Sequence, residues 1–111
     1  MAITHERRRY PRAEVIWPVT IVTADAQIEG EVRNVSPAGA FIACEDIPPL
    51  EGRFRLLIKP PKRQTMTITA KVIWSTVITP NEGVPHLGVG VQFTHVSKDD
   101  SKYLYGVIAE L

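Results

Sequence analysis

Between residues 13 and 94, six short segments rich in β-branched and aromatic residues follow one another, and each ends at a turn signal. They are residues 13–23, 27–35, 40–44, 54–58, 65–75 and 88–94. Short strands at this spacing predict a small antiparallel β-barrel or sandwich. With 111 residues, the chain has room for one domain of this kind.

Residues 65–75 alternate most clearly, with the period of two that is typical of a half-buried strand. The positions that we expect on its inward face are Met66, Ile68, Ala70, Val72 and Trp74. In residues 27–35, the positions expected to share one side are Ile28, Gly30, Val32 and Asn34. The tripeptide VIW occurs at 15–17 and at 72–74, and we interpret it as two buried strands, with Trp17 and Trp74 in the core, rather than as a repeat.

The C-terminal segment has a different pattern. Ser97 precedes Asp99 and Asp100, which suit the first turn of a helix because the helix dipole favours acids there. The apolar positions that follow at helical spacing are Tyr103, Leu104, Val107, Ile108 and Leu111. The sequence therefore predicts a C-terminal amphipathic helix that lies against the barrel.

Positive charge is concentrated at the N-terminus. Residues 1–12 carry four arginines and one glutamate and sum to +3, whereas the remaining residues carry nine basic and eleven acidic groups and sum to −2. We divide the chain into a flexible basic arm (1–12), a barrel (13–96) and a helix (97–111), all within one domain. The net charge of +1 argues against DNA as a partner.

The composition predicts a bacterial-style cytoplasmic domain. No apolar run approaches the length of a membrane span, and the basic N-terminus leads into no apolar segment of a secretory signal. Cys44 is the single cysteine, which excludes an internal disulfide and fits a reducing compartment. At the end of an apolar segment, Cys44 is expected to be a small core residue.

Catalytic and metal-binding patterns are absent from the sequence. His5, His86 and His95 are far apart, and none has a second histidine or cysteine at metal-ligand spacing. No nucleophile motif, zincin motif or phosphate-binding glycine loop is present. The GVG at 88–90 leads into no helix and indicates a bulge or close packing. We expect neither an enzyme nor a cofactor.

Two short motifs remain. RRYPR at 8–12 contains Arg8 and Arg12 with three residues between them. All the cations of the arm are arginines, which suit bidentate recognition of phosphates and of guanine. NVSPAG at 34–39 presents Asn34, Ser36 and Gly39 at a strand end. Taken alone, the first motif is also compatible with a solvated tail. The second is compatible with a turn in which Gly39 takes a positive φ.

The two motifs, in this order, resemble those of the PilZ domain family. The segments AFI and GVGVQF and the terminal helix follow as they do in that family, so the resemblance covers essentially the whole chain. The resemblance implies a six-stranded antiparallel β-barrel with a C-terminal helix, acting as a cytosolic receptor for cyclic di-GMP. Arg8 and Arg12 match the motif arginines. Asn34, Ser36 and Gly39 match the second motif, with asparagine in place of the commoner aspartate.

The resemblance also implies a mechanism, in which the ligand orders the arm and a downstream protein partner recognises the result. Arg9 and Arg7 are further candidates for ligand contact. In this family, an arginine at the position of Arg7 is associated with binding a stacked pair of ligands.

Two alternatives stay open. The chain is compatible with a PilZ-type adaptor that binds proteins and no ligand, and less well with a small barrel that binds single-stranded nucleic acid, which would need aromatics interleaved with cations on one strand face. The sequence does not choose between monomer and homodimer, nor among motility, exopolysaccharide synthesis and pilus control as the pathway.

Overall fold

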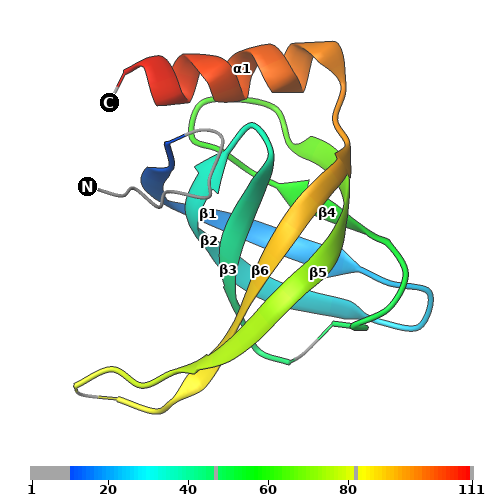
Figure 1. Ribbon diagram of the computed structural model, residues 1–111, viewed down its shortest axis with the longest axis vertical. Helices are drawn as coiled ribbons and strands as arrows, with labels where there is room; N and C mark the ends of the chain where they lie inside the picture. The colour runs from blue at the N-terminus through cyan, green and yellow to red at the C-terminus, as the bar shows by residue number, and fades with distance from the viewer. Residues whose placement is uncertain (1–10, 47, 82, 111) are drawn as a thin grey trace, which may run out of the picture.

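The computed structural model describes residues 11–46, 48–81 and 83–110. They form six strands and one helix: β1 (Ala13–Val22), β2 (Gln27–Ser36), β3 (Gly39–Cys44), β4 (Phe54–Ile58), β5 (Met66–Ile78), β6 (His86–His95) and α1 (Lys98–Ala109). All strand pairs are antiparallel. The strands close into a barrel in the order β1-β2-β3-β6-β5-β4, which confirms the expected fold class (Figure 1).

The core fills the inside of this barrel with aliphatic side chains from every strand. Those without solvent exposure include Ile21, Val32, Val35, Ile42, Leu56, Ile58, Met66, Ile68 and Val89. Trp17 is 6% exposed, so its predicted place in the core is confirmed. Cys44 is buried as expected, and desolvation, together with the nearby Asp46 carboxylate, raises the pKa of its thiol.

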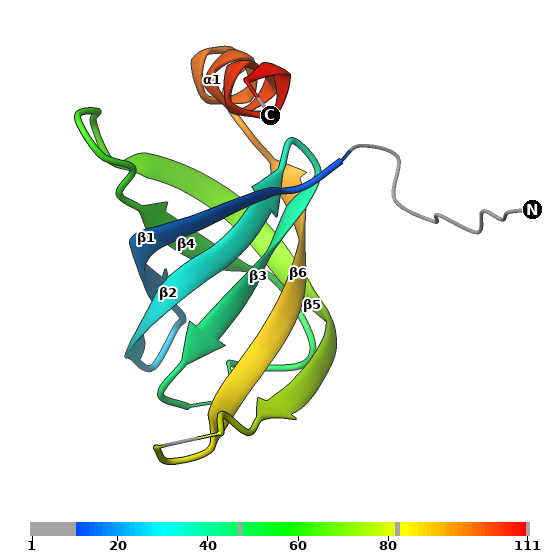
Figure 2. The same ribbon diagram turned by 90° about the vertical axis from the view of Figure 1, so that its left-hand side faces the viewer.

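Helix α1 closes one end of the barrel, as Figures 1 and 2 show. It begins after the predicted cap, because the Ser97 hydroxyl accepts a hydrogen bond from the Asp100 amide at 3.1 Å. Leu104 is fully buried under it. Arg63, in the β4–β5 loop, holds the helix against the barrel through two contacts. Its guanidinium lies 3.1 Å from the Asp100 carboxylate and 4.4 Å from the centre of the Tyr103 ring.

Two β-bulges overturn part of the predicted alternation. On β2 the register shifts between Val32 and Asn34, so Val35 is buried and Asn34 faces outward, not inward with Val32. On β5 it shifts between Val72 and Trp74, and Trp74 is 44% exposed on the outer face, so its predicted core position is wrong. A bulge inserts one extra residue into one strand, and a one-residue slip moves every later side chain to the opposite face.

Within the described ranges, no helix is both long and apolar enough to cross a lipid bilayer.

Candidate functional site

The two bulges place four residues in one row across the outside of the barrel. Asn34 on β2 lies opposite Phe41 on β3, and Phe41 lies opposite Gly90 on β6. Gly90 in turn lies opposite Trp74 on β5. The row therefore crosses β2, β3, β6 and β5, the strands that lie side by side in Figure 2. Bulges that turn side chains outward are frequent beside functional sites.

Arg12 extends the row at its β2 end. This residue directly precedes β1, and its Nη1 donates a hydrogen bond to the Asn34 side-chain oxygen at 3.0 Å. The bond joins the two sequence motifs, because Arg12 ends the first and Asn34 begins the second. Asn34 thereby fixes the guanidinium of Arg12 against the outer face, at the point where the N-terminal arm meets the barrel.

Ser36 and Gly39 shape the turn between β2 and β3. Ser36 is 5% exposed, and its hydroxyl accepts a hydrogen bond from the Ala38 amide at 3.1 Å. The Ala38 carbonyl accepts one from the Phe93 amide at 2.8 Å, so the turn is pinned to β6. In this structure Ser36 acts as a turn residue beside Asn34, and its hydroxyl is committed to the backbone.

Gly39 is required for close packing. The described glycines with positive φ are Gly52 and Gly83, so the expected positive φ at Gly39 is wrong. A Cβ at Gly39 would collide with the Val91 carbonyl oxygen of β6. The glycine therefore lets the backbones of β3 and β6 approach closely.

An aromatic pair forms the other end of the row and was missed by the sequence analysis. The rings of Phe41 and Trp74 stack with centroids 5.2 Å apart and an interplanar angle of 14°. They lie over bare backbone, since a Cβ at Gly90 would collide with the Trp74 indole and one at Gly88 with the Phe41 ring. The GVG at 88–90 was therefore the available signal, and its interpretation as close packing is confirmed.

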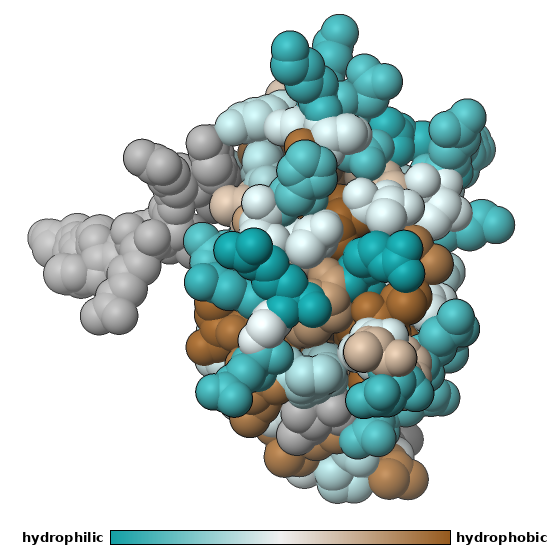
Figure 3. Space-filling model, turned by 90° about the vertical axis from the view of Figure 1, so that its right-hand side faces the viewer, coloured by the Kyte–Doolittle hydropathy of each residue, from teal (hydrophilic) through white to brown (hydrophobic). Residues whose placement is uncertain are grey.

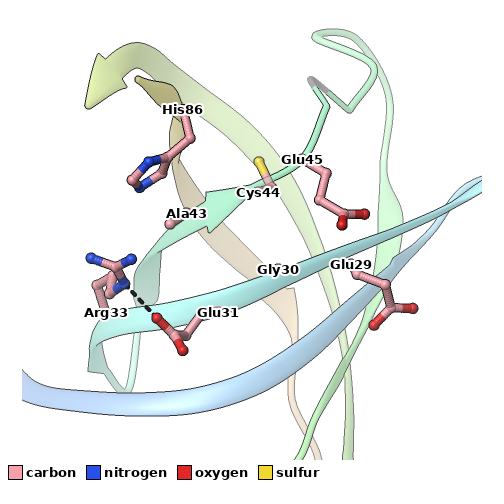
Figure 4. A pocket seen from close by; sticks show the side chains of 8 residues that line it. All are labelled: Glu29, Gly30, Glu31, Arg33, Ala43, Cys44, Glu45 and His86. Atoms are coloured by element: carbon pink, nitrogen blue, oxygen red, sulfur yellow. Dashed lines mark hydrogen bonds and ion pairs between the residues drawn. The ribbon is translucent and has the colours of Figure 1, made fainter. Parts of the chain in front are cut away.

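The charge on this side of the barrel is uneven. Beyond the row, a hollow opens over β2, β3 and the start of β6 (Figure 4). Its lining residues are Glu29, Gly30, Glu31, Arg33, Ala43, Cys44, Glu45 and His86. Arg33 is bound by Glu31, Nε to Oε1 at 2.8 Å, so the hollow is acidic overall. An anion is therefore favoured at the Arg12 end of the row and disfavoured in the hollow.

The remaining predicted site residues are Arg7, Arg8 and Arg9, and they lie outside the described residues, as does His5. In the part of the chain that the structure describes, no group of three or more histidine, cysteine or acidic side chains could hold a metal ion.

The comparison with protein families gives a match over almost the whole chain. A model of the PilZ domain matches residues 6–110. No curated protein matches the sequence. Among solved structures, the PilZ domain of YcgR from Escherichia coli, solved with c-di-GMP, is similar with a TM-score of 0.79 and 19% identity, over 96% of this chain and 92% of that one.

Two longer proteins are similar as well. The inhibitor of motility MotI/DgrA from Bacillus subtilis matches with a TM-score of 0.75 and 17% identity over 95% of this chain. MrkH, described as a c-di-GMP-dependent transcription regulatory factor, matches with a TM-score of 0.75 and 17% identity over 94% of this chain. This chain spans 50% of the length of each of them.

Proposed function

Because the chain belongs to the PilZ domain family, we propose that it is a receptor for cyclic di-GMP, which binds on the outer row between Arg12 and Trp74. The observation that carries the proposal is the Arg12–Asn34 hydrogen bond of 3.0 Å, because it joins the two sequence motifs on the outer face of the barrel. The solved YcgR domain with c-di-GMP supports the choice of ligand.

The chemistry of the ligand fits the arginines. Cyclic di-GMP carries two phosphates and two guanines, and an arginine can bond guanine O6 and N7 together, which contributes about 1–3 kcal/mol of discrimination. Arg12 would bond guanine in this way while Asn34 orients its guanidinium. Arg8, four residues earlier, would supply the second fork, and Ser36 would keep the β2–β3 turn in place.

The aromatic pair adds a stacking surface. Trp74 is 44% exposed and already lies flat on the sheet, so a guanine ring could stack on the outer side of its indole without rearranging the core. Stacking of a base on an aromatic side chain contributes about 1–3 kcal/mol.

In the proposed mechanism, the ligand neutralises the arginines of residues 1–12 and fixes this arm on the outer face. Ordering each residue costs about 1–2 kcal/mol, so the arm is fixed only when several contacts form together. The new surface is then recognised by a downstream protein in the cytoplasm. The chain acts as a receptor and not as an enzyme. Arg9 and Arg7 bind phosphate, with Arg7 setting whether one ligand or a stacked pair is bound.

Calorimetric titration with cyclic di-GMP tests this function. We expect saturable binding by the wild type and its loss in Arg8→Ala and Arg12→Ala. Arg55→Ala is the matched control, because Arg55 is exposed on β4, outside the row, and this variant should bind like the wild type. In Arg7→Leu, a halved stoichiometry would assign the second ligand to Arg7. An absence of binding by the wild type would leave the protein adaptor as the function.

One finding also favours single-stranded nucleic acid, because Trp74 is exposed and not buried as expected. The acidic hollow beside the row would repel an extended phosphate backbone, whereas a compact dinucleotide can avoid it. Titration with a single-stranded oligonucleotide separates the two: tight, salt-dependent binding that excess cyclic di-GMP leaves unchanged would favour nucleic acid.

A further inference from the structure

Strand β5 runs far beyond its neighbour β4. The β4–β5 ladder covers Met66 to Ala70, whereas β5 continues to Ile78 and is paired there with β6 alone. In Figure 1 this part of the β5–β6 hairpin projects below the barrel. Among the described residues, no backbone hydrogen bond from another segment reaches residues 71–78 on the β4 side. A closed barrel thus retains one open strand edge.

This edge lacks the features that usually protect one. Natural edge strands are guarded by lysines, prolines, charges or bulges. Residues 72–79 contain no charged residue, proline or glycine. Six of these eight residues are valine, isoleucine or threonine, and they flank Trp74 and Ser75 on either side. Ile73 is 52% and Val77 59% exposed. The bulge at Ile73 guards only the start of the edge, since pairing with β6 is regular from Trp74 to Ile78.

We propose that this edge is a homodimer interface, in which Trp74–Ile78 pairs antiparallel with the same segment of a second copy about a two-fold axis at Thr76. The regular segment is five residues long and Thr76 is its centre. In this register Thr76 lies opposite itself, Ser75 opposite Val77, and Trp74 opposite Ile78 of the second copy. The two hairpins then form one four-stranded sheet in the order β6-β5-β5-β6.

A second copy fits this edge for two reasons. The first is charge: pairing a segment without charges with itself brings no like charges together. The second is the pairs that form, because threonine opposite threonine and an aromatic opposite a β-branched residue are favourable cross-strand pairs. A two-fold interface must be self-complementary, and this register meets that condition. The proposal does not rest on ligand binding.

Cysteine cross-linking tests the register in the purified protein. Thr76→Cys places two thiols opposite each other across the axis, within the range for a disulfide when copper–phenanthroline supplies the oxidant. Thr67→Cys is the matched control, because Thr67 is an exposed threonine on the same strand whose edge is covered by Leu57 of β4. We expect a disulfide-linked dimer for Thr76→Cys and a monomer for Thr67→Cys. Equal cross-linking of both variants would overturn the register.

Sedimentation velocity over a range of concentrations tests the dimer itself. We expect a reversible monomer–dimer equilibrium for the wild type, without added ligand. Val77→Lys places a charge on the edge at an exposed position and should weaken the dimer by about tenfold or more. Thr67→Lys should leave it unchanged. A wild type that stays monomeric up to its highest soluble concentration, or a Val77→Lys variant that dimerises equally well, would refute the proposal. The proposal would also be refuted if the Thr76→Cys variant in cells formed cross-links only to a different protein.

Discussion

The two VIW segments have the same sequence, and each lies at a register shift between paired strands, but their tryptophans have opposite outcomes. In both, the valine packs partly against the core and the isoleucine is exposed, Ile16 by 71% and Ile73 by 52%. The tryptophans differ: Trp17 is 6% exposed and lies 6.1 Å from Tyr103 of the helix, whereas Trp74 is 44% exposed on the outer face. Local sequence therefore does not decide where either indole goes.

The partner strand explains the difference. Trp17 lies opposite Val32, a fully buried core residue, so its indole packs in the core under α1. Trp74 lies opposite Gly90, and the missing side chain leaves a bare strip of β6 on which the indole lies flat. The Trp74 indole is therefore half-buried although it lies on the outer face, and its ring can stack with Phe41.

The largest difference between the two segments should appear in stability. Trp17→Ala removes a nearly buried indole from the core and should lower the free energy of unfolding by about 3–5 kcal/mol. Trp74→Ala removes a half-exposed ring and should lower it by about 1 kcal/mol. Urea denaturation followed by circular dichroism measures both. Equal losses would mean that the outer aromatic pair stabilises the fold as strongly as the core does.

A second prediction tests Gly90 as the cause. Gly90→Ala places a methyl group where the Trp74 indole lies, so the ring must move off the sheet, at a cost of about 1–3 kcal/mol. The near-ultraviolet circular dichroism of the stacked pair should fall at the same time. Gly52→Ala is unsuitable as a control because Gly52 has φ of +83°, whereas Gly106, with open space around its Cβ position, is suitable.

The double variant Gly90→Ala/Trp74→Ala completes this test. Because the clash needs both groups, the loss in the double variant should be smaller than the sum of the two single losses, with a coupling of about 1 kcal/mol or more. Additive losses would show that the glycine is needed for strand pairing alone and that the indole is placed by something else.

The comparison also shows which features local sequence could predict. The strands and the helix follow from alternation, helical spacing and the Ser97 cap, each of which acts within a few residues along the chain. The bulges at Arg33 and Ile73 arise from register with a neighbouring strand, so an unbroken alternation was expected through Asn34 and Trp74 and both were assigned to the wrong face. The motifs named Arg12, Asn34, Ser36 and Gly39, yet packing alone showed what Gly39 does.

A third prediction concerns the ligand rather than the fold. Trp74→Ala should weaken cyclic di-GMP binding by about tenfold, because stacking of a base on an aromatic ring contributes about 1–3 kcal/mol. Trp74→Phe should recover part of the affinity. Calorimetry measures both, and Trp74→Ala should leave the stoichiometry unchanged. Unaltered affinity would confine the ligand to the Arg12–Asn34 end of the row and leave the aromatic pair a structural role.

The smallest changes in stability should come from the two isoleucines of the VIW segments, because both side chains are exposed. Ile16→Ser and Ile73→Ser each remove an apolar side chain that already contacts water, so the free energy of unfolding should change by less than about 0.5 kcal/mol. Urea denaturation provides the measurement, and Ile42→Ser, at a fully buried position of β3, is the contrasting control. A large loss at Ile16 alone would mean that the hollow it lines with Pro18, Lys59 and Pro60 is packed more tightly than its exposure indicates. The two segments would then behave alike only at the valine, and they would already differ at the isoleucine before the tryptophan.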